Sequence, residues 1–173
     1  MKYEKIGDLC DSYKVTVKPK NNVTYALFSF PAFDLNKTPE LAIGNAIKSN
    51  KFAVDNYSIL FNKLNVHSKR VWNIGRLTSQ NNICSTEFIP LHAKDCIDQD
   101  YLYYCLVSDE VTNDMNTSQN GTSNSHQRIN EEILFAHEIP VPTMGIQKRI
   151  ASILRNLDDK INLNNAINEN LAA

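Results

Sequence analysis

The chain has 173 residues, of which 42% are hydrophobic, enough for one domain with a sizeable core and too many for wholesale disorder. Eighteen Lys and Arg residues face nineteen Asp and Glu residues. The resulting net charge of −1 excludes a protein that coats nucleic acid by bulk charge, although a local basic face stays open. The four cysteines form no C-x-x-C pair and predict no metal site. Neither a secretion signal nor a membrane-spanning apolar run occurs, so we expect a cytoplasmic protein that does not engage a membrane.

The first half of the chain reads mainly as short strands. A short helix is expected over 3–12, followed by an alternating strand over 13–17 and an apolar strand over 23–30. Residues 31–56 favour further short strands, and the segments 57–61, 70–74 and 84–91 are rich in β-branched and aromatic residues. These patterns predict a sheet-based domain.

Two segments of the second half differ from that pattern. Asp98 is placed to cap a helix over 99–108. Residues 112–125 contain a single apolar side chain, Met115, and are expected to form a solvated or ligand-contacting loop.

A long helix is predicted to close the chain. Pro140 and Pro142 stop any preceding strand, and Thr143 can cap a helix that continues to the last residue, about 43 Å long at about 1.5 Å per residue. Its a/d positions, spaced as in a coiled coil, are Ile150, Leu154, Leu157, Ile161, Asn164, Asn168 and Leu171. We therefore expect a partner helix, and the alternative is a helix that folds back on its own domain. The fold class is α+β: a mixed, mainly β domain with short helices over 1–142 and a coiled-coil-type helix over 143–173.

No catalytic constellation stands out. Phosphate-binding loops of the G-x-x-x-x-G-K-[ST] type are absent, and Asp158 and Asp159 are helix neighbours that point in different directions. Cys84 and His92 are the one pair from which a small hydrolase could be built, but neither has a recognisable turn signature or an orienting acid.

Charge is more informative than catalytic residues. Residues 60–94 contain five Lys and Arg residues against Glu87 alone, and 14–20 contain three lysines and no acid. These stretches predict a positive face, and the residues expected to hold phosphates are Lys63, Lys69, Arg70, Arg76, Thr122 and Ser123. Amide and guanidinium groups suited to base edges occur in two polar loops, at Gln80, Asn81, Asn124, Gln127 and Arg128.

The order of several short motifs resembles one target-recognition unit of a type I restriction-modification specificity subunit. The motifs are Ile6-Gly7-Asp8-Leu9-Cys10, Ile59-Leu60-Phe61-Asn62-Lys63-Leu64-Asn65, Arg70-Val71-Trp72, Ser85-Thr86-Glu87-Phe88, Tyr101-Leu102-Tyr103-Tyr104, Gly121-Thr122-Ser123-x-Ser125-x-Gln127-Arg128, Ile139-Pro140-x-Pro142, Gln147-Lys148-Arg149-Ile150-Ala151-x-Ile153-Leu154 and Leu157-Asp158-x-Lys160-Ile161. Each motif alone is weak, and their order over nearly the whole chain is specific.

The resemblance implies a non-catalytic domain that reads one half of a split double-stranded DNA site. It implies that the long helix pairs antiparallel with that of a second unit, and that methylation and restriction subunits dock on the assembly. No cofactor is expected in this chain, because S-adenosylmethionine, ATP and Mg²⁺ would serve the partner subunits. Family members usually carry two units, so this chain is either a half-subunit that dimerises or a piece of a longer protein.

Two alternatives accompany this interpretation. One is a non-enzymatic adaptor that recruits a protein through its C-terminal helix, and the other is the Cys84–His92 hydrolase. Steep weakening of DNA affinity by salt would distinguish the DNA-binding function from the adaptor.

Overall fold

The computed structural model describes residues 2–117 and 128–171. A four-stranded antiparallel sheet forms the middle layer, in the order β2 (Cys10–Ser12), β10 (Phe88–Ala93), β7 (Ile59–Asn62) and β8 (Val71–Asn73). A five-stranded mixed sheet has the order β3 (Thr16–Val17), β6 (Lys51–Ala53), β9 (Asn82–Cys84), β4 (Thr24–Phe28) and β5 (Glu40–Ile43). A small antiparallel pair joins β1 (Tyr3–Lys5) to β11 (Glu138–Pro140).

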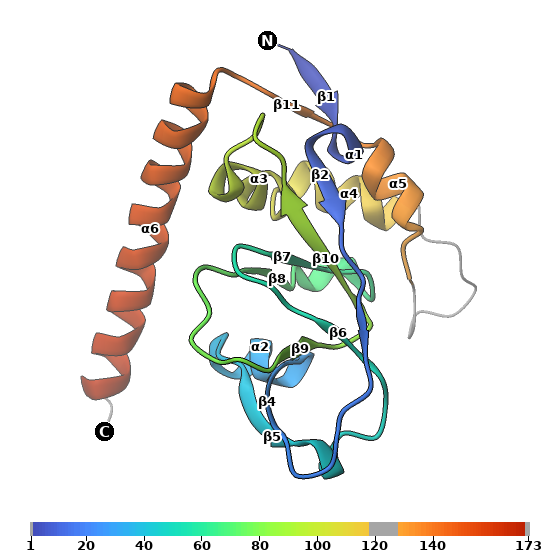
Figure 1. Ribbon diagram of the computed structural model, residues 1–173. Coiled ribbons are helices and arrows are strands. Elements are labelled where there is room, and N and C mark those ends of the chain that lie inside the picture. The colour runs from blue at the N-terminus through green and yellow to red at the C-terminus, as the bar shows by residue number, and fades with distance from the viewer. Residues whose placement is uncertain (1, 118–127, 172–173) are drawn as a thin grey trace.

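Helices lie on both sides of the middle sheet, and the longest helix follows the last strand. They are α1 (Ile6–Leu9), α2 (Phe30–Asn36), α3 (Gln99–Leu106), α4 (Asp109–Thr117), α5 (Glu131–Ala136) and α6 (Met144–Leu171), with short 3₁₀ turns η1 (Gly44–Ala46) and η2 (Val66–Ser68). Figure 1 shows α1, α3, α4 and α5 at one end of the domain, and the lobe of β4, β5, β9 and α2 at the other. The α+β class predicted from the sequence is confirmed.

The middle sheet is buried on both faces, which explains its nearly unbroken apolar sequence. Ile59 and Phe61 of β7 pack in the core beneath the helices, whereas Leu60 between them packs in a second core against the five-stranded sheet. The second core is aromatic: Phe28 meets Trp72 edge-on, with ring centroids 4.7 Å apart. Side chains that alternate along β7 therefore point into two different cores, rather than into one core and the solvent.

Several predicted elements are confirmed, notably the strands β4, β7 and β8 and the helix α3. The Asp98 side chain accepts a hydrogen bond from the Tyr101 backbone N–H at 3.0 Å, as expected of an N-cap. The predicted strand 84–91 is instead two strands in different sheets, divided by a turn in which Phe88 N–H bonds the Ser85 carbonyl at 3.0 Å. The predicted helix over 3–12 is one turn, α1, between β1 and β2.

Two helices replace segments predicted as strand or loop. Residues 31–56 contain the short strands β5 and β6, but α2 precedes them, with Ser29 as its cap and Pro31 in its first turn. The predicted loop 112–125 is wrong over its described part, because α4 continues to Thr117 and buries Val111 and Met115 completely. Residues 118–127 lie outside the described residues.

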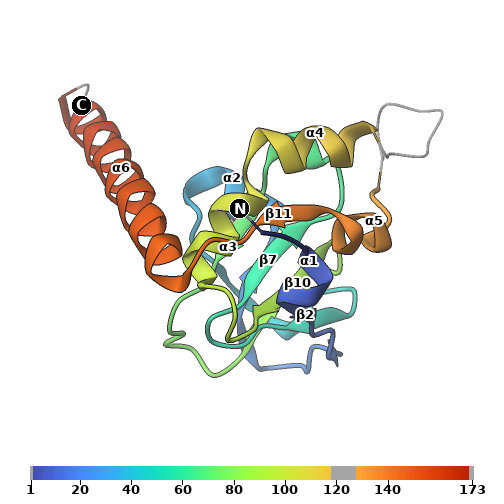
Figure 2. The same cartoon turned by 90° about the horizontal axis from the view of Figure 1, so that it is seen from above.

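The long helix α6 is anchored at its start by a buried glutamine. The Gln147 side chain is 1% exposed, accepts from Asp98 N–H at 2.8 Å, and donates to the carbonyls of Pro142 at 2.8 Å and Cys96 at 3.4 Å. Ala151 is buried, and Ile150 packs on the core beneath the helices. The first turns of α6 therefore lie on the chain's own domain, and Figure 2 shows the C-terminal turns diverging from it.

Candidate nucleic-acid interface

Most of the predicted phosphate-contacting cations are held in ion pairs. Lys63 lies 3.9 Å from Glu131, Lys69 pairs with Asp109, and Arg70 pairs with Asp34 at 2.7 Å; Arg128, a predicted base reader, pairs with Glu87 at 2.6 Å. Three of the acidic partners come from outside the basic stretch 60–94. The fold thus brings distant carboxylates to the cations of this stretch, and the positive face stays a prediction.

Arg70 links two elements of the domain. Its guanidinium donates two hydrogen bonds to Asp34 of α2, at 2.7 and 2.8 Å. The guanidinium carbon Cζ lies 5.2 Å from the centroid of the Phe30 ring. The hydrogen bonds lower the pKa of Asp34, and the pair favours the ionised carboxylate. This arrangement ties α2 to the start of β8 and gives Arg70 a structural task.

Arg128 and Lys63 belong to one charged cluster, at the point where the described residues resume. Leu64 and Arg128 form an isolated β-bridge, and Ile129 N–H bonds the Lys63 carbonyl at 3.0 Å. The Arg128 guanidinium donates to both oxygens of Glu87, at 2.9 and 2.6 Å, and these bonds lower the pKa of Glu87. Because Arg128 is exposed, its side chain can exchange this carboxylate for another acceptor.

The second polar loop connects β8 to β9. Arg76 is exposed and has no ion pair among the residues that the structure describes. Gln80 is exposed, and the Asn81 amide donates to the Thr24 carbonyl at 3.3 Å, so part of its hydrogen-bonding capacity serves the turn. The loop is further held by the Leu77 N–H, which donates to the Asn56 side chain at 2.7 Å.

The segment 74–82, which contains the first predicted reading loop, and Arg128, the described residue of the second, lie on different sides of the domain. In Figures 1 and 2 the segment 74–82 lies on the side of the domain that faces α6, and α5 lies on the opposite side. The contacts agree with the pictures: Asn73 and Gly75 line a depression with Arg155 of α6, whereas Lys63 reaches Glu131 at the start of α5. The remaining predicted residues of this site, Thr122, Ser123, Asn124 and Gln127, lie outside the described residues.

A groove of about 600 Å³ separates α6 from the body of the domain. Apolar side chains of α6 line one wall, and aromatic side chains of α2, β8 and α3 line the other: Leu154, Leu157, Ile161, Phe33, Trp72 and Tyr103. Polar contacts bridge the groove, since the Tyr104 hydroxyl donates to Asp158 at 2.9 Å and Arg155 pairs with Asp100. Burial and this hydrogen bond to Asp158 raise the pKa of Tyr104.

The Cys84–His92 alternative finds no geometric support. Cys84 is completely buried, which raises its pKa to about 12, and a protonated thiol is a poor nucleophile. His92 lies in the other sheet, with its Nε2 3.4 Å from the Ser58 hydroxyl. Within 2–117 and 128–171, no group of three His, Cys, Asp or Glu side chains is suited to a metal ion. No helix in these ranges is long and apolar enough to cross a membrane.

Three solved structures share this fold. The chain aligns with the HsdS subunit from Thermoanaerobacter tengcongensis at a TM-score of 0.73 and 18% identity, covering 93% of this chain and 43% of the subunit. A chain from a study of complex assembly and conformational transition of the type I R-M system gives 0.77 and 17%, covering 96% and 44%. The type I restriction-modification S subunit from M. genitalium gives 0.61 and 17%, covering 93% and 40%.

These likenesses establish the fold, and the chain spans less than half the length of each of the three proteins. No curated protein sequence matches the chain significantly. The family described as "Type I restriction modification DNA specificity domain" matches over residues 1–173, the whole of the sequence. The chain therefore belongs to the type I restriction modification DNA specificity domain family.

Proposed function

We propose that this chain is a non-catalytic, sequence-specific DNA-binding unit that reads one half of a bipartite target for a type I restriction-modification complex. The observation that carries the proposal is the family match over the entire chain. Cys84, the nucleophile of the hydrolase alternative, is buried, which agrees with a role in recognition rather than catalysis.

The side of the domain that carries Lys63 and Arg128 is the better candidate for the DNA-reading face. Arg128 bridges to Leu64, next to Lys63, and it directly follows in sequence the predicted readers Asn124 and Gln127 and the predicted phosphate ligands Thr122 and Ser123. Exposed ion pairs contribute only about 0–1 kcal/mol, so a DNA phosphate or a base can replace Glu87 at the Arg128 guanidinium. The loop with Arg76, Gln80 and Asn81 faces the other way and becomes the second choice.

We further propose that α6 pairs antiparallel with the corresponding helix of a second unit. Support comes from the exposed apolar side chains of the helix, of which Leu157, Ile161 and Leu171 are each half exposed or more. Such a stripe is costly in water and is typical of a surface that a partner covers. Methylation and restriction subunits, with their S-adenosylmethionine, ATP and Mg²⁺, would supply the chemistry.

Selection of duplexes from a random pool by the full chain tests the DNA-reading function. We expect a recurring motif after sequencing. The affinity should fall steeply between about 50 and 200 mM salt, because Lys and Arg side chains that bind DNA phosphates displace counterions from them. Failure to enrich any sequence, together with binding that salt leaves unchanged, would contradict the proposal and favour the adaptor.

The two faces are distinguished by Arg128→Ala and Arg76→Ala, measured on the selected motif. If Arg128 reads a base, its removal should weaken binding by about 1–3 kcal/mol and relax the sequence preference at one position. The matched Arg76→Ala variant loses the same charge and should retain the full sequence preference. The opposite result would assign reading to the β8–β9 loop.

A further inference from the structure

A second group of cations lies on the lobe of the five-stranded sheet, apart from the predicted candidates. It consists of Lys18, Lys20, Lys48 and Lys51, which we call the lysine surface. None of the four forms an ion pair with a described residue, in contrast to Lys63, Lys69, Arg70 and Arg128. Lys18, Lys20 and Lys48 are exposed, and Lys51 is partly exposed.

Two chain segments bring these lysines together. Val17 pairs with Lys51 across β3 and β6, which sets Lys18 next to that pair. Gly44 packs on the backbone of Lys20 so closely that a Cβ there would lie 2.1 Å from the Lys20 carbonyl oxygen. The Asn22 N–H donates to the Asn45 side chain at 2.9 Å, which fixes the turn after Lys20 against the turn before Lys48.

The charge around these turns is almost entirely positive. Between residues 13 and 53 the sequence contains six lysines and two acids, and one of those acids, Asp34, is engaged by Arg70. The other, Glu40, accepts a hydrogen bond from Ser29 and shares a depression with Lys48 and Lys51. The ammonium groups of Lys48 and Lys51 donate hydrogen bonds to neutral oxygens, of Asn45 and Ser49, rather than to a carboxylate.

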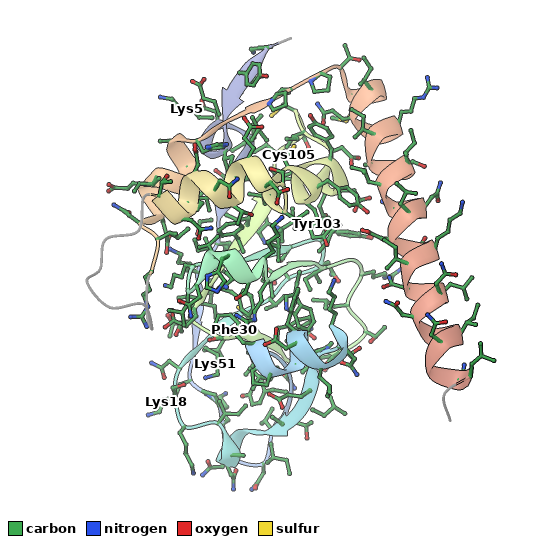
Figure 3. All side chains as sticks on the ribbon, turned by 180° about the vertical axis from the view of Figure 1, so that it is seen from behind. Lys5, Lys18, Phe30, Lys51, Tyr103 and Cys105 are labelled. Atoms are coloured by element: carbon green, nitrogen blue, oxygen red, sulfur yellow. The ribbon has the colours of Figure 1, made fainter. Side chains whose placement is uncertain are left out.

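The position of the lysine surface matches the proposed reading face. Figure 3 shows Lys18 and Lys51 on the side of the molecule away from α6, where α5 also lies. The Lys63–Glu131 pair joins the charged cluster of Arg128 to the same α5. The free lysines therefore extend the reading face toward the end of the five-stranded lobe.

We propose that the lysine surface binds phosphates of the DNA duplex flanking the bases that the unit reads. The proposal rests on the function proposed above and adds the place where the backbone is held. Lysine ammonium groups bind phosphate as point charges and carry no sequence information, so the surface would supply affinity and orientation rather than specificity. This division suits a chain in which three predicted phosphate ligands, Lys63, Lys69 and Arg70, pair with carboxylates.

The test compares two variants of the full chain on random-sequence duplex DNA. One replaces Lys18, Lys20, Lys48 and Lys51 with Gln. The matched control replaces Lys5, Lys148, Arg149 and Lys160 with Gln. These residues are exposed and lie outside the lobe, and the control changes the net charge by the same amount. The measurement is the slope of log Kd against log salt concentration, together with thermal unfolding to show that each variant folds.

We expect the lysine-surface variant to lose about one unit of salt slope per lysine and at least about tenfold in affinity at low salt, while the control keeps the wild-type slope. The motif selected from a random pool should stay the same in both. If the fourfold variant does not fold, the double variants at Lys18 and Lys20 and at Lys48 and Lys51 should each lose about half of the effect.

The possible failures are separable. A wild-type slope in the lysine-surface variant would overturn the lysine surface and leave the DNA-reading function intact. Equal losses in both variants would also overturn it, because they would indicate a response to net charge alone. Absence of salt-dependent binding by the wild-type chain would instead contradict the proposed function.

Discussion

Gln147 shows how a single polar side chain fixes the direction of the longest helix. It is buried at the base of α6 and uses its amide oxygen and nitrogen on backbone groups of the loop before α3 and of the residues before α6. A buried amide with its hydrogen bonds satisfied is well tolerated, and one that loses them is costly. The residue belongs to the Gln-Lys-Arg-Ile motif of the sequence, and its role is positioning.

Replacement of Gln147 by Ala should lower the free energy of unfolding by about 1–3 kcal/mol, because the Asp98 N–H would be left without its acceptor. Chemical denaturation gives the value directly. Arg149→Ala, on the exposed side of the same turn, is the control and should change stability by less than about 0.5 kcal/mol. Equal losses in the two variants would show that Gln147 is not the anchor.

A second residue-scale prediction concerns pH. The hydrogen bonds from Arg128 lower the pKa of Glu87 from its usual 4.5 in the folded chain. The ion pair therefore stabilises the fold above about pH 4.5, and this contribution is lost as the pH falls through the folded-state pKa. Glu87→Gln should flatten the fall of stability between about pH 5 and pH 3, measured by thermal unfolding. Glu138→Gln, an exposed acid outside the pair, should leave the wild-type profile unchanged.

At the scale of elements, the local sequence was sufficient to predict a helix or strand where a single pattern, such as an apolar run or a helix cap, dominated the segment. The apolar runs of β4 and β7 and the Asp98 cap of α3 predicted their elements correctly. The polar composition of α4 favours a loop, because Asn, Thr and Asp are weak helix formers, and so the sequence alone does not predict this helix. Its helix is stabilised by packing of Val111 and Met115 against the core, which involves residues far away in the sequence. By contrast, the start of α2 can be predicted from local sequence, because Ser29 is a typical cap and Pro31 a typical first-turn residue. The prediction of short strands over 31–56 did not take these two residues into account.

The candidate site was less predictable than the fold, for a related reason. The basic stretch 60–94 is real in sequence, yet two of its cations, Arg70 and Lys69, pair with carboxylates 36 and 40 residues away. Only the folded chain brings these partners together. The lysines at 18 and 20 were noticeable as a run without acids, but their proximity to Lys48 and Lys51 depends on the β3–β6 pairing.

Self-pairing of α6 can be tested at one central position. Ile161 is the middle residue of the predicted seam, and in an antiparallel pair the middle residue meets its own copy. Ile161→Glu would place two carboxylates face to face in an apolar contact and should raise the dimer dissociation constant at least about tenfold. Sedimentation equilibrium measures the effect. Asn156→Glu, an exposed position on the same helix, is the control, and a wild-type chain that stays monomeric at every concentration would sink the prediction.

At the scale of the whole molecule, the two proposed interfaces lie on different sides of the chain. One side carries the Arg128 cluster and the lysine surface, and the other carries α6 with its apolar groove. A net charge of −1 is therefore an average over sides that differ in charge and apolar character. Separation of the two surfaces would let a second unit cover α6 without blocking the proposed DNA contacts.

If α6 is the spacer between two recognition units, as proposed, its length should be measurable in the DNA target. Duplicating one heptad of α6 after Ile161 retains the a/d register and lengthens the helix by about 10 Å at about 1.5 Å per residue. If two units read two half-sites, the selected motif should keep both half-sites, and the gap between them should grow by about three base pairs at about 3.4 Å each. Sequencing of duplexes selected by the wild type and by the lengthened chain gives both gaps. An unchanged gap would mean that something other than α6 sets the distance between the two recognition units.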